Sequence, residues 1–154
     1  MNGNLPPGLK IRRFEPSDLM DILSIEKECF EPGIRYDSLT FLYYILAYRD
    51  RLVFYVAEMG RVLVGYVLAI VENEICHLVS IAVRRRYRKR GIGGSLLDLA
   101  MNECRAKGAG KAVLEVAVDN KDALDFYSKR GWRIIGVLDK YYGNRDAYLM
   151  ERPL

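Results

Sequence analysis

Residues 75–104 read ICHLVSIAVRRRYRKRGIGGSLLDLAMNEC, and this stretch decides the fold of the chain. Its first part, Ile75–Val83, is apolar and rich in β-branched residues, which predicts a β-strand. The next seven residues, Arg84–Arg90, include six Lys or Arg and no acid. From Gly91 to about Lys107 the apolar residues recur at helical spacing, with one face made of Leu96, Leu97, Ala100, Met101 and Cys104. The stretch therefore predicts a strand, a basic turn and a helix in direct succession.

The basic turn, Arg84–Arg90, concentrates the positive charge of the chain. The whole chain has 24 Lys and Arg against 20 Asp and Glu, and without the six cations of the turn the balance is 18 minus 20, or −2. The glycines that follow leave backbone N–H groups open to a ligand, and the start of a helix adds partial positive charge. Such a site favours a polyanion, and the combination suits a pyrophosphate.

Other anion-binding patterns fit this turn less well. A P-loop requires Gly-Lys-Ser/Thr at the start of the helix, and a dinucleotide fingerprint requires a third glycine where Leu96 stands. A nucleic-acid patch usually interleaves aromatic residues with its cations, and only Tyr87 lies in this turn. A nucleic-acid-binding surface and a solvated run of charge stay open, although charge alone does not explain the glycines.

The remaining segments predict one domain in which strands and helices are mixed. Capping residues and apolar spacing predict three further helices, which are Leu19–Phe30 after Pro16-Ser17-Asp18, residues 38–48 after Asp37, and Asn120–Arg130 with Gly131 at its C-cap. Alternating or continuous apolar runs predict strands at Lys10–Phe14, Leu52–Glu58, Val62–Val71, Lys111–Val118, Trp132–Leu138 and Ala147–Glu151. Lys111–Val118 is apolar on both faces, which is typical of a central strand.

Length and composition limit the class of protein. A chain of 154 residues is enough for one domain, and 51% hydrophobic with 29% charged residues excludes a disordered chain. The longest apolar stretch, Val62–Val71, is too short to cross a bilayer, and no secretory signal is visible, so we expect a cytoplasmic protein without a membrane partner. The three cysteines show neither a disulfide framework nor the spacing of a zinc site.

Several motifs, taken in order, resemble the GCN5-related N-acetyltransferases (GNAT). Arg88-Lys89-Arg90-Gly91-Ile92-Gly93 is similar to the acetyl-CoA motif of that family, and residues 114–132 are similar to its later segment, through Leu114-Glu115-Val116, Asn120, Leu124, Tyr127, Gly131 and Trp132. The segments 77–83 and 141–150 resemble more narrowly the archaeal Ard-type and bacterial RimI-type protein N-terminal acetyltransferases. The resemblance implies a flexible segment 1–9 and one GNAT domain over 10–154. That fold is a central, mostly antiparallel twisted sheet with a V-shaped opening for acetyl-CoA, flanked by about four helices.

The resemblance assigns a role in cofactor binding to one continuous region and two later residues. The strand backbone at Ile81, Ala82 and Val83 would pair with the pantetheine of acetyl-CoA. Asn120 would line the cofactor groove, and Tyr127 would lie near the thioester sulfur. The pyrophosphate would be held by the turn and the start of the helix, which comprise Arg88, Lys89, Arg90, Gly91, Ile92, Gly93, Gly94 and Ser95.

The same resemblance implies three catalytic residues and no required metal. Glu115 matches the glutamate assigned as general base, His77 matches a histidine near the same site, and Tyr127 would give a hydrogen bond to the departing thiolate. His77 is the only histidine and has the same strand phase as Ile81, which places it on the face of the proposed groove. A glutamate with its ordinary pKa of about 4.3 is a poor direct acceptor for the proton of an attacking amine unless burial raises that pKa, whereas a histidine at about 6.5 matches better. The alternatives are that Glu115 only pairs with a basic side chain, that His77 is an ordinary core or surface residue, and that Tyr127 only packs.

The acceptor would be the free α-amino group of a protein or peptide N-terminus. Ile34, Tyr36 and Tyr141 are the candidate acceptor-binding residues, with Tyr142 beside them, although Ile34 and Arg35 depart from the pattern of the relatives. The alternatives are a lysine or small-amine acetyltransferase, and a CoA- or nucleic-acid-binding module without catalysis. Ribosome association is compatible with an acetyltransferase of protein N-termini, and so is either a monomer or a homodimer.

Overall fold

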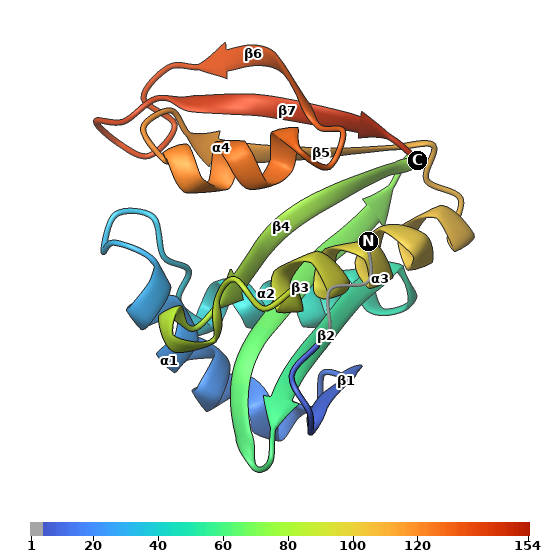
Figure 1. Ribbon diagram of the computed structural model, residues 1–154. Helices are drawn as coiled ribbons and strands as arrows, with labels where there is room; N and C mark the ends of the chain where they lie inside the picture. The colour runs from blue at the N-terminus through green and yellow to red at the C-terminus, as the bar shows by residue number, and fades with distance from the viewer. Residues whose placement is uncertain (1–4) are drawn as a thin grey trace.

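The computed structural model describes residues 5–154, which form one seven-stranded sheet flanked by four α-helices (Figure 1). The strands are β1 (Leu9–Arg13), β2 (Leu52–Met59), β3 (Val62–Glu72), β4 (Ile75–Val83), β5 (Lys111–Ala117), β6 (Arg133–Leu138) and β7 (Ala147–Pro153). The helices are α1 (Leu19–Cys29), α2 (Ser38–Tyr48), α3 (Ile92–Ala106) and α4 (Lys121–Ser128), with short 3-10 turns at Pro16–Asp18, Arg49–Arg51 and Arg85–Tyr87. The predicted mixed α/β class is confirmed.

The sheet opens between β4 and β5, which are the one parallel pair among the described strands. The strand order is β1-β2-β3-β4-β5-β7-β6, and every neighbouring pair within residues 5–154 is antiparallel except β4 with β5. In that pair only Ile75–His77 and Lys111–Val113 are in register. Beyond them the two strands diverge, as Figure 1 shows. The sheet is therefore mostly antiparallel and opens as a V between β4 and β5, as the sequence predicted.

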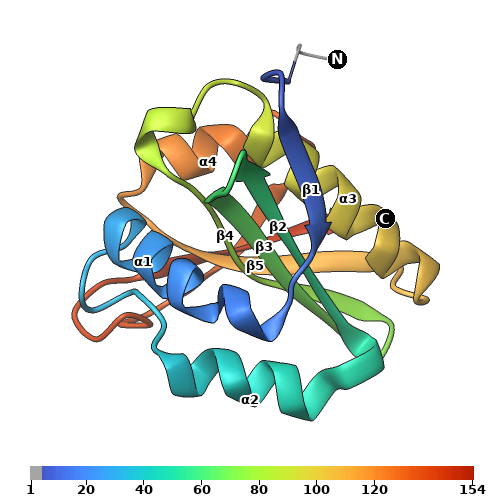
Figure 2. The ribbon, with the colours of Figure 1, turned by 90° about the horizontal axis from the view of Figure 1, so that it is seen from below.

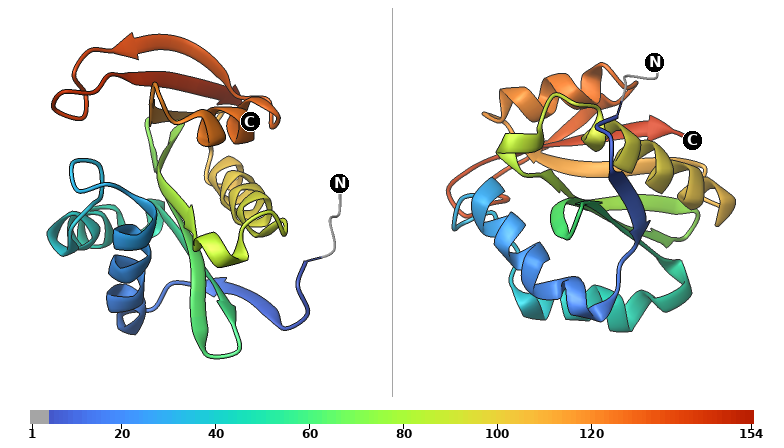
Figure 3. Two further views of the ribbon diagram at one scale, coloured as in Figure 1. Left: turned by 60° about the vertical axis from the view of Figure 1, so that its left-hand side comes forward. Right: turned by 60° about the horizontal axis from the view of Figure 1, so that its bottom comes forward.

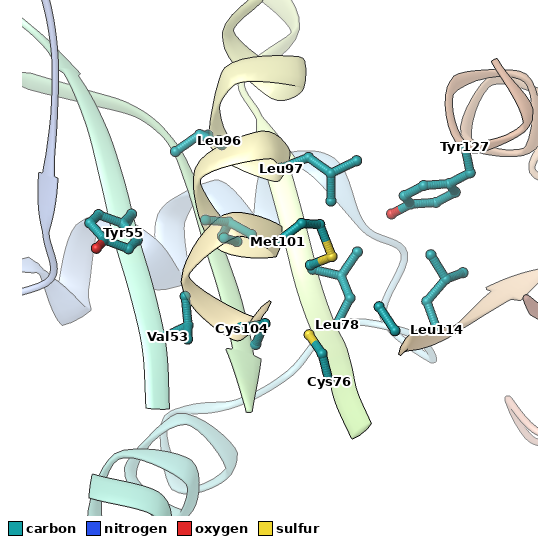
Figure 4. Packing of buried hydrophobic residues seen from close by; sticks show 14 of the residues in the cluster. Val53, Tyr55, Cys76, Leu78, Leu96, Leu97, Met101, Cys104, Leu114 and Tyr127 are labelled. Carbon is teal, nitrogen blue, oxygen red and sulfur yellow. The ribbon is translucent and has the colours of Figure 1, made fainter. Parts of the chain in front are cut away.

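The helices cover the two faces of the sheet and complete two hydrophobic clusters. Figures 2 and 3 show α1 and α2 on one side of β2–β4 and α3 on the other. The α3 side buries Leu96, Leu97 and Met101 against β5 and the inner strands (Figure 4), whereas the α1 and α2 side buries Ile22 and Phe41. Removal of this apolar surface from water contributes about 25 cal/mol per Å². The two clusters hold β4 between them, so its position relative to α1 and α3 is fixed.

Two local features shape β4 near the opening. The pairing of β3 with β4 shifts between Leu68 and Ala69, which pair with Ser80 and Leu78, so Val79 forms a bulge. Gly65 of β3 lies so close to β4 that a Cβ atom there would be 2.8 Å from the carbonyl oxygen of Ala82. Only glycine allows this close approach, which keeps the last residues of β4 against the sheet.

The predicted element boundaries agree with the structure to within two residues at every end. α4 ends at Ser128 rather than Arg130, and its C-cap is Lys129 rather than Gly131. Gly131 lies two residues beyond the cap with φ +87°, where the chain turns away from the helix. The sequence signal for a helix end was correct, but an extra turn separates the cap from the glycine. Trp132 likewise precedes β6, which begins at Arg133.

The N-terminal prediction lies partly outside the described residues. Residues 1–4 of the expected flexible segment 1–9 are not described, and β1 begins at Leu9, one residue before the expected domain start. None of the helices within residues 5–154 has both the length and the apolarity of a membrane span.

Candidate active site

A cleft of about 910 Å³ occupies the opening between β4 and β5. Its lining comes from both strands, from the basic turn and the start of α3, from α4, and from the loops that follow α1 and β6. Cations lie at one end, where Arg88, Lys89 and Arg130 line it. Carboxylates of Glu26, Glu31, Glu115 and Asp119 line the other end, together with Arg145, and the lining near Arg130 also includes Asp122, Asp125 and Lys129. The cleft therefore has a basic end and an acidic end, and the two require separate description.

The basic end is built by backbone geometry at the start of α3. Lys89 and Gly91 have φ values of +61° and +84°, and Gly91 is the N-cap of the helix. The first hydrogen bond of the helix runs from the Ser95 N–H to the Gly91 carbonyl at 3.0 Å. The N–H groups of Ile92, Gly93 and Gly94 precede that bond, and the first N–H groups of a helix have no partner within it. They therefore form an anion-binding end of the helix.

The structure adds a cation that the sequence did not indicate. Arg130, after α4, lies over the start of α3, where a Cβ at Gly94 would be 3.0 Å from its Nη2 atom. Its guanidinium stacks 3.9 Å from the centre of the Phe126 ring and donates to the Phe126 carbonyl at 2.9 Å. The stacking holds the side chain in place. Because Arg130 is far from the basic turn in sequence, only the packing of α4 beside α3 could reveal it.

Two residues of the predicted phosphate site do not line the cleft. Arg90 places its guanidinium 5.8 Å from the centre of the Tyr87 ring, and the Ser95 N–H is used inside α3. The other predicted residues between Arg88 and Gly94 do line it, as do Ile81, Ala82, Val83 and Asn120. Asn120 also caps α4, since its side chain accepts from the Ala123 N–H at 3.2 Å. The predicted donor site is thus largely brought together in one place.

The edge of β4 that faces the cleft has backbone groups free of β5 beyond His77. The register with β5 stops there, while the opposite edge stays bonded to β3 through Val83. The Val83 carbonyl accepts from Arg88 Nε at 2.8 Å and from Cys29 Sγ at 3.5 Å. An extended ligand can therefore follow this edge toward the narrow end of the V.

His77 and Glu115 meet at the narrow end of the opening. The Nε2 atom of His77 and the Oε2 atom of Glu115 are 2.7 Å apart, and the side chains are 29% and 18% exposed. Parallel pairing of β4 with β5 places Val113 opposite His77, and Glu115 follows on the same face. Glu115 lines the cleft directly, whereas His77, which its strand phase predicted to face the groove, contacts Glu115 without lining the cleft. The pair can take a proton from the cleft at Glu115 and share it with the imidazole.

Tyr127 reaches the cleft from α4. Its ring makes edge contacts with Phe126 and Trp132, and Figure 4 shows the side chain directed inward from α4 above Leu114. Burial raises the pKa of the Tyr127 hydroxyl above its usual range. The hydroxyl therefore stays protonated and acts as a hydrogen-bond donor. Transfer of its proton is less favourable than for a tyrosine in water.

The acidic end is lined by two aromatic residues from separate loops. Tyr36 precedes α2, and Tyr142 lies between β6 and β7, where its hydroxyl donates to the Glu115 carbonyl at 3.5 Å. Burial raises the pKa of both tyrosines, so both remain neutral donors. Ile34 lines the cleft as predicted, but Tyr141 does not. Tyr141 packs edge-on against Tyr142 at 4.8 Å and is 43% exposed, so it supports the wall from outside.

Arg145 joins the loops around the acidic end, which the sequence did not indicate. It donates to Glu31 at 2.7 Å and also to Asp119, so one guanidinium connects the loop after α1, the end of β5 and the loop before β7. All three residues line the cleft. Glu26 was noticed only as part of the α1 pattern, although it is 1% exposed and hydrogen-bonded inside this end.

No group of three His, Cys, Asp or Glu side chains with the arrangement of a metal site occurs in the described part of the chain. The expectation that no metal is required stays a prediction. The pair of His77 and Glu115 is explained by their mutual contact.

Comparison with known proteins relates this site to one family. Residues 19–132 match the model of the acetyltransferase (GNAT) family. An N-α-acetyltransferase of Sulfolobus acidocaldarius is 32% identical over an alignment of 159 positions, gaps included. The alignment covers 94% of this chain and 92% of that protein. A second, from Sulfurisphaera tokodaii, is 37% identical over 115 residues, or 66% of this chain and 69% of that protein. The crystal structure of Ard1 from Thermoplasma volcanium is similar with a TM-score of 0.86 and 26% identity, over 96% of this chain and 98% of that one.

Proposed function

The chain belongs to the acetyltransferase (GNAT) family, and on that premise we propose that it transfers acetyl from acetyl-CoA to the free α-amino group of protein N-termini. The observation that carries this proposal is the division of one cleft into a basic, amide-rich end and an acidic, tyrosine-lined end. Glu115, in contact with His77, belongs to the acidic end. A polyanionic donor and a cationic acceptor can therefore enter from opposite ends and meet at a proton acceptor.

The residues present at the basic end fit coenzyme A. The N–H groups of Ile92, Gly93 and Gly94 provide donors for a pyrophosphate, and Arg88 and Arg130 provide charge. The edge of β4 provides backbone partners for the amides of pantetheine. The narrow end of the V then brings the thioester near His77 and Glu115.

The transfer proceeds by direct attack of the neutral amine on the thioester carbonyl. The amine adds to the thioester carbonyl, so the C–N bond forms and the carbonyl oxygen becomes an oxyanion. The amine proton passes to Glu115 and is shared with His77, and the C–S bond breaks as the oxyanion returns to a carbonyl. Backbone N–H groups of β4 stabilise the oxyanion, a contribution of about 3–4 kcal/mol per donor in other acyl transfers. The departing thiolate receives a hydrogen bond from Tyr127 and takes the proton that Glu115 and His77 hold, which yields the free CoA thiol and restores the pair.

The acidic end favours an α-amine. An α-amine with a pKa of about 8 is deprotonated at pH 7 for about 1.4 kcal/mol, whereas a lysine at about 10.4 requires about 4.6 kcal/mol. Glu31 and Glu115 attract the ammonium form to the cleft, and Tyr36 and Tyr142 form the walls beside the first residue of the acceptor. Because the α-amine costs less to deprotonate than lysine, Glu115 with His77 is sufficient as its proton acceptor.

We extend the proposal to the setting of the reaction, which we place in the cytoplasm. Free N-termini are available there during and after synthesis, so a ribosome-associated or a free enzyme both fit, as a monomer or a homodimer. Co-sedimentation with ribosomes and size-exclusion chromatography with light scattering would distinguish these arrangements.

The proposal is tested by CoA release with a panel of peptides. The panel contains free N-termini that begin Met-Glu, Met-Leu, Ser, Ala and Glu, and one blocked peptide with an internal lysine. Turnover confined to the free N-termini is the expected result. Turnover on the blocked lysine peptide, or on small amines alone, would contradict it. CoA binding without any turnover would instead indicate a binding module.

A further inference from the structure

Glu26 is a buried carboxylate for which the proposed chemistry has no direct use. It lies on α1, is 1% exposed, and its side chain faces the sheet beside the acidic end of the cleft. The other buried acid of the described chain, Asp18, is paired with Arg12 at 2.8 Å. Glu26 instead makes its contacts with neutral groups. An uncompensated charge in such a place is costly, so its partners require explanation.

Three donors from three separate elements converge on this carboxylate. Oε1 accepts from the Tyr66 hydroxyl of β3 and, at 3.0 Å, from Ser80 Oγ of β4. Oε2 accepts from the backbone N–H of Tyr36 at 2.9 Å. The Tyr66 and Ser80 hydroxyls are themselves 2.8 Å apart. Both oxygens are therefore satisfied, and every donor keeps a defined direction.

These donors belong to the two sides that must meet for the transfer. Ser80 directly follows the bulged Val79 in β4, the strand whose edge faces the donor. Tyr36 belongs to the loop of residues 31–37 that forms the acceptor wall, here called the acceptor loop. One carboxylate thus spans from the donor strand to the acceptor loop.

We propose that Glu26 is a positioning residue for acetyl transfer, whose carboxylate holds the acceptor loop at Tyr36 in register with the bulged segment of β4. The inference rests on the proposed function, because it names what aligns the two substrates of that reaction. An error of about 1 Å in such alignment can reduce a rate by about 100-fold.

The alternative role, simple packing, is less consistent with the contacts. An apolar side chain of similar volume would fill the same space without burying a charge. It could not orient a backbone N–H and two hydroxyls at once. Burial raises the pKa of the Glu26 carboxyl to about 7, while the hydrogen bonds from Tyr36 and Ser80 and the charge of Arg35 lower it. These donors therefore help to keep the carboxylate form available near neutral pH.

The test compares the Glu26→Gln variant with the wild type in two binding assays and in steady-state kinetics. A glutamine oxygen can still accept from Tyr66 and Ser80, but its NH₂ group would then face the Tyr36 N–H, and two donors would oppose each other. We expect the affinity for a CoA–acetyl–peptide conjugate and the kcat/KM for the peptide to fall about 30-fold, within the range that misalignment can produce. The affinity for CoA alone and the KM for acetyl-CoA should change less than about 2-fold, because the donor end is intact.

Two further variants keep the result interpretable. Asp21→Asn makes the same kind of substitution on the exposed face of α1 and should match the wild type in every assay. Ser80→Ala removes one donor and leaves the charge and the Tyr36 contact, so it should show the same selective loss at a smaller size, about 3-fold to 5-fold.

Equal weakening of CoA and conjugate binding by Glu26→Gln would overturn the proposal, since a general loss of structure would then explain both. Unchanged conjugate binding and kinetics would overturn it as well. If the wild type acetylates lysine or a small amine instead, the proposed function fails, and the same comparison with that acceptor still decides the role of Glu26.

Discussion

The two ends of the cleft are built in different ways. The donor end uses mainly one continuous segment, Ile81–Gly94, whose backbone amides and exposed cations need only a strand, a turn and a helix start. The acceptor end uses side chains from α1, the acceptor loop, β5 and the loop before β7. Its tyrosines and Glu26 have pKa values raised by burial. Anion binding therefore requires local geometry, whereas acceptor chemistry requires a tertiary environment.

The largest expected effect is at the donor end, where Gly91→Asp should raise the Kd for CoA about 1000-fold. Aspartate and asparagine both adopt the positive φ of Gly91 (+84°) more readily than other side chains, so the loss comes mainly from the carboxylate, whose repulsion of the phosphates costs several kcal/mol. Isothermal titration calorimetry measures the change. Gly91→Asn is the matched control, because asparagine tolerates this φ and has no charge, and it should lose far less affinity. Equal losses in the two variants would show that charge is irrelevant at this end.

The second effect is expected at the acceptor end, in the pH dependence of the free energy of unfolding. Burial raises the pKa of Glu26 from 4.5 to about 7, so folding favours the protonated form. The associated stability is complete below pH 4.5 and is lost as the pH rises to 7. From pH 5 to pH 8 the unfolding free energy of the wild type should therefore fall by about 2–3 kcal/mol relative to Glu26→Gln. Urea unfolding of both proteins at the two pH values measures this difference, and a constant difference would contradict it.

The third effect concerns the proton acceptor, Glu115. Glu115→Gln removes the negative partner of His77, so kcat should fall about 30-fold while the Kd for CoA changes less than about 2-fold. Stopped-flow detection of thiol release and calorimetry measure the two quantities. Parallel losses in kcat and CoA affinity would mean that the two ends are not independent.

The smallest effect is expected for the bridge across the acceptor loops. Arg145→Gln breaks the contacts with Glu31 and Asp119, so the KM for a peptide should rise about 3-fold. Because the three side chains are partly exposed, the difference from the wild type should shrink in 1 M salt, where the Debye length is about 3 Å. An equal effect on the KM for acetyl-CoA would place Arg145 in the donor end instead.

Much of the donor end was predictable because its parts are neighbours in sequence. The strand, the basic turn and the helix start lie within Ile75–Gly94, and local patterns specify each of them. The errors there concern side-chain direction. Arg90 stacks on Tyr87 rather than entering the cleft, and Arg130 enters it from α4. A run of cations indicates that an anion site exists, but not which of its side chains point toward it.

Glu26 and Arg145 show the limit of the sequence at the acceptor end. Glu26 occupies an apolar position of a helical pattern, and its hydrogen-bond partners lie 10, 40 and 54 residues away. Arg145 bonds Glu31, which is 114 residues away. Neither set of contacts can be recognised from a pattern of neighbouring residues in the sequence. Likewise, the conformation of the loop between β6 and β7 determines that Tyr142 lines the cleft and Tyr141 does not.

By itself the sequence determined the elements, their order and the donor turn, and its resemblance to the acetyltransferases implied the candidates His77, Glu115 and Tyr127. These follow from hydrophobic period, capping, glycine placement and motif, which act over a few residues. Only the tertiary structure decided that His77 and Glu115 touch across a parallel pair, that β4 and β5 then separate, and that Glu26 joins the acceptor loop to β4. The physical reason is that a contact between distant segments, and the burial that shifts a pKa, depend on how the packed elements are placed in space.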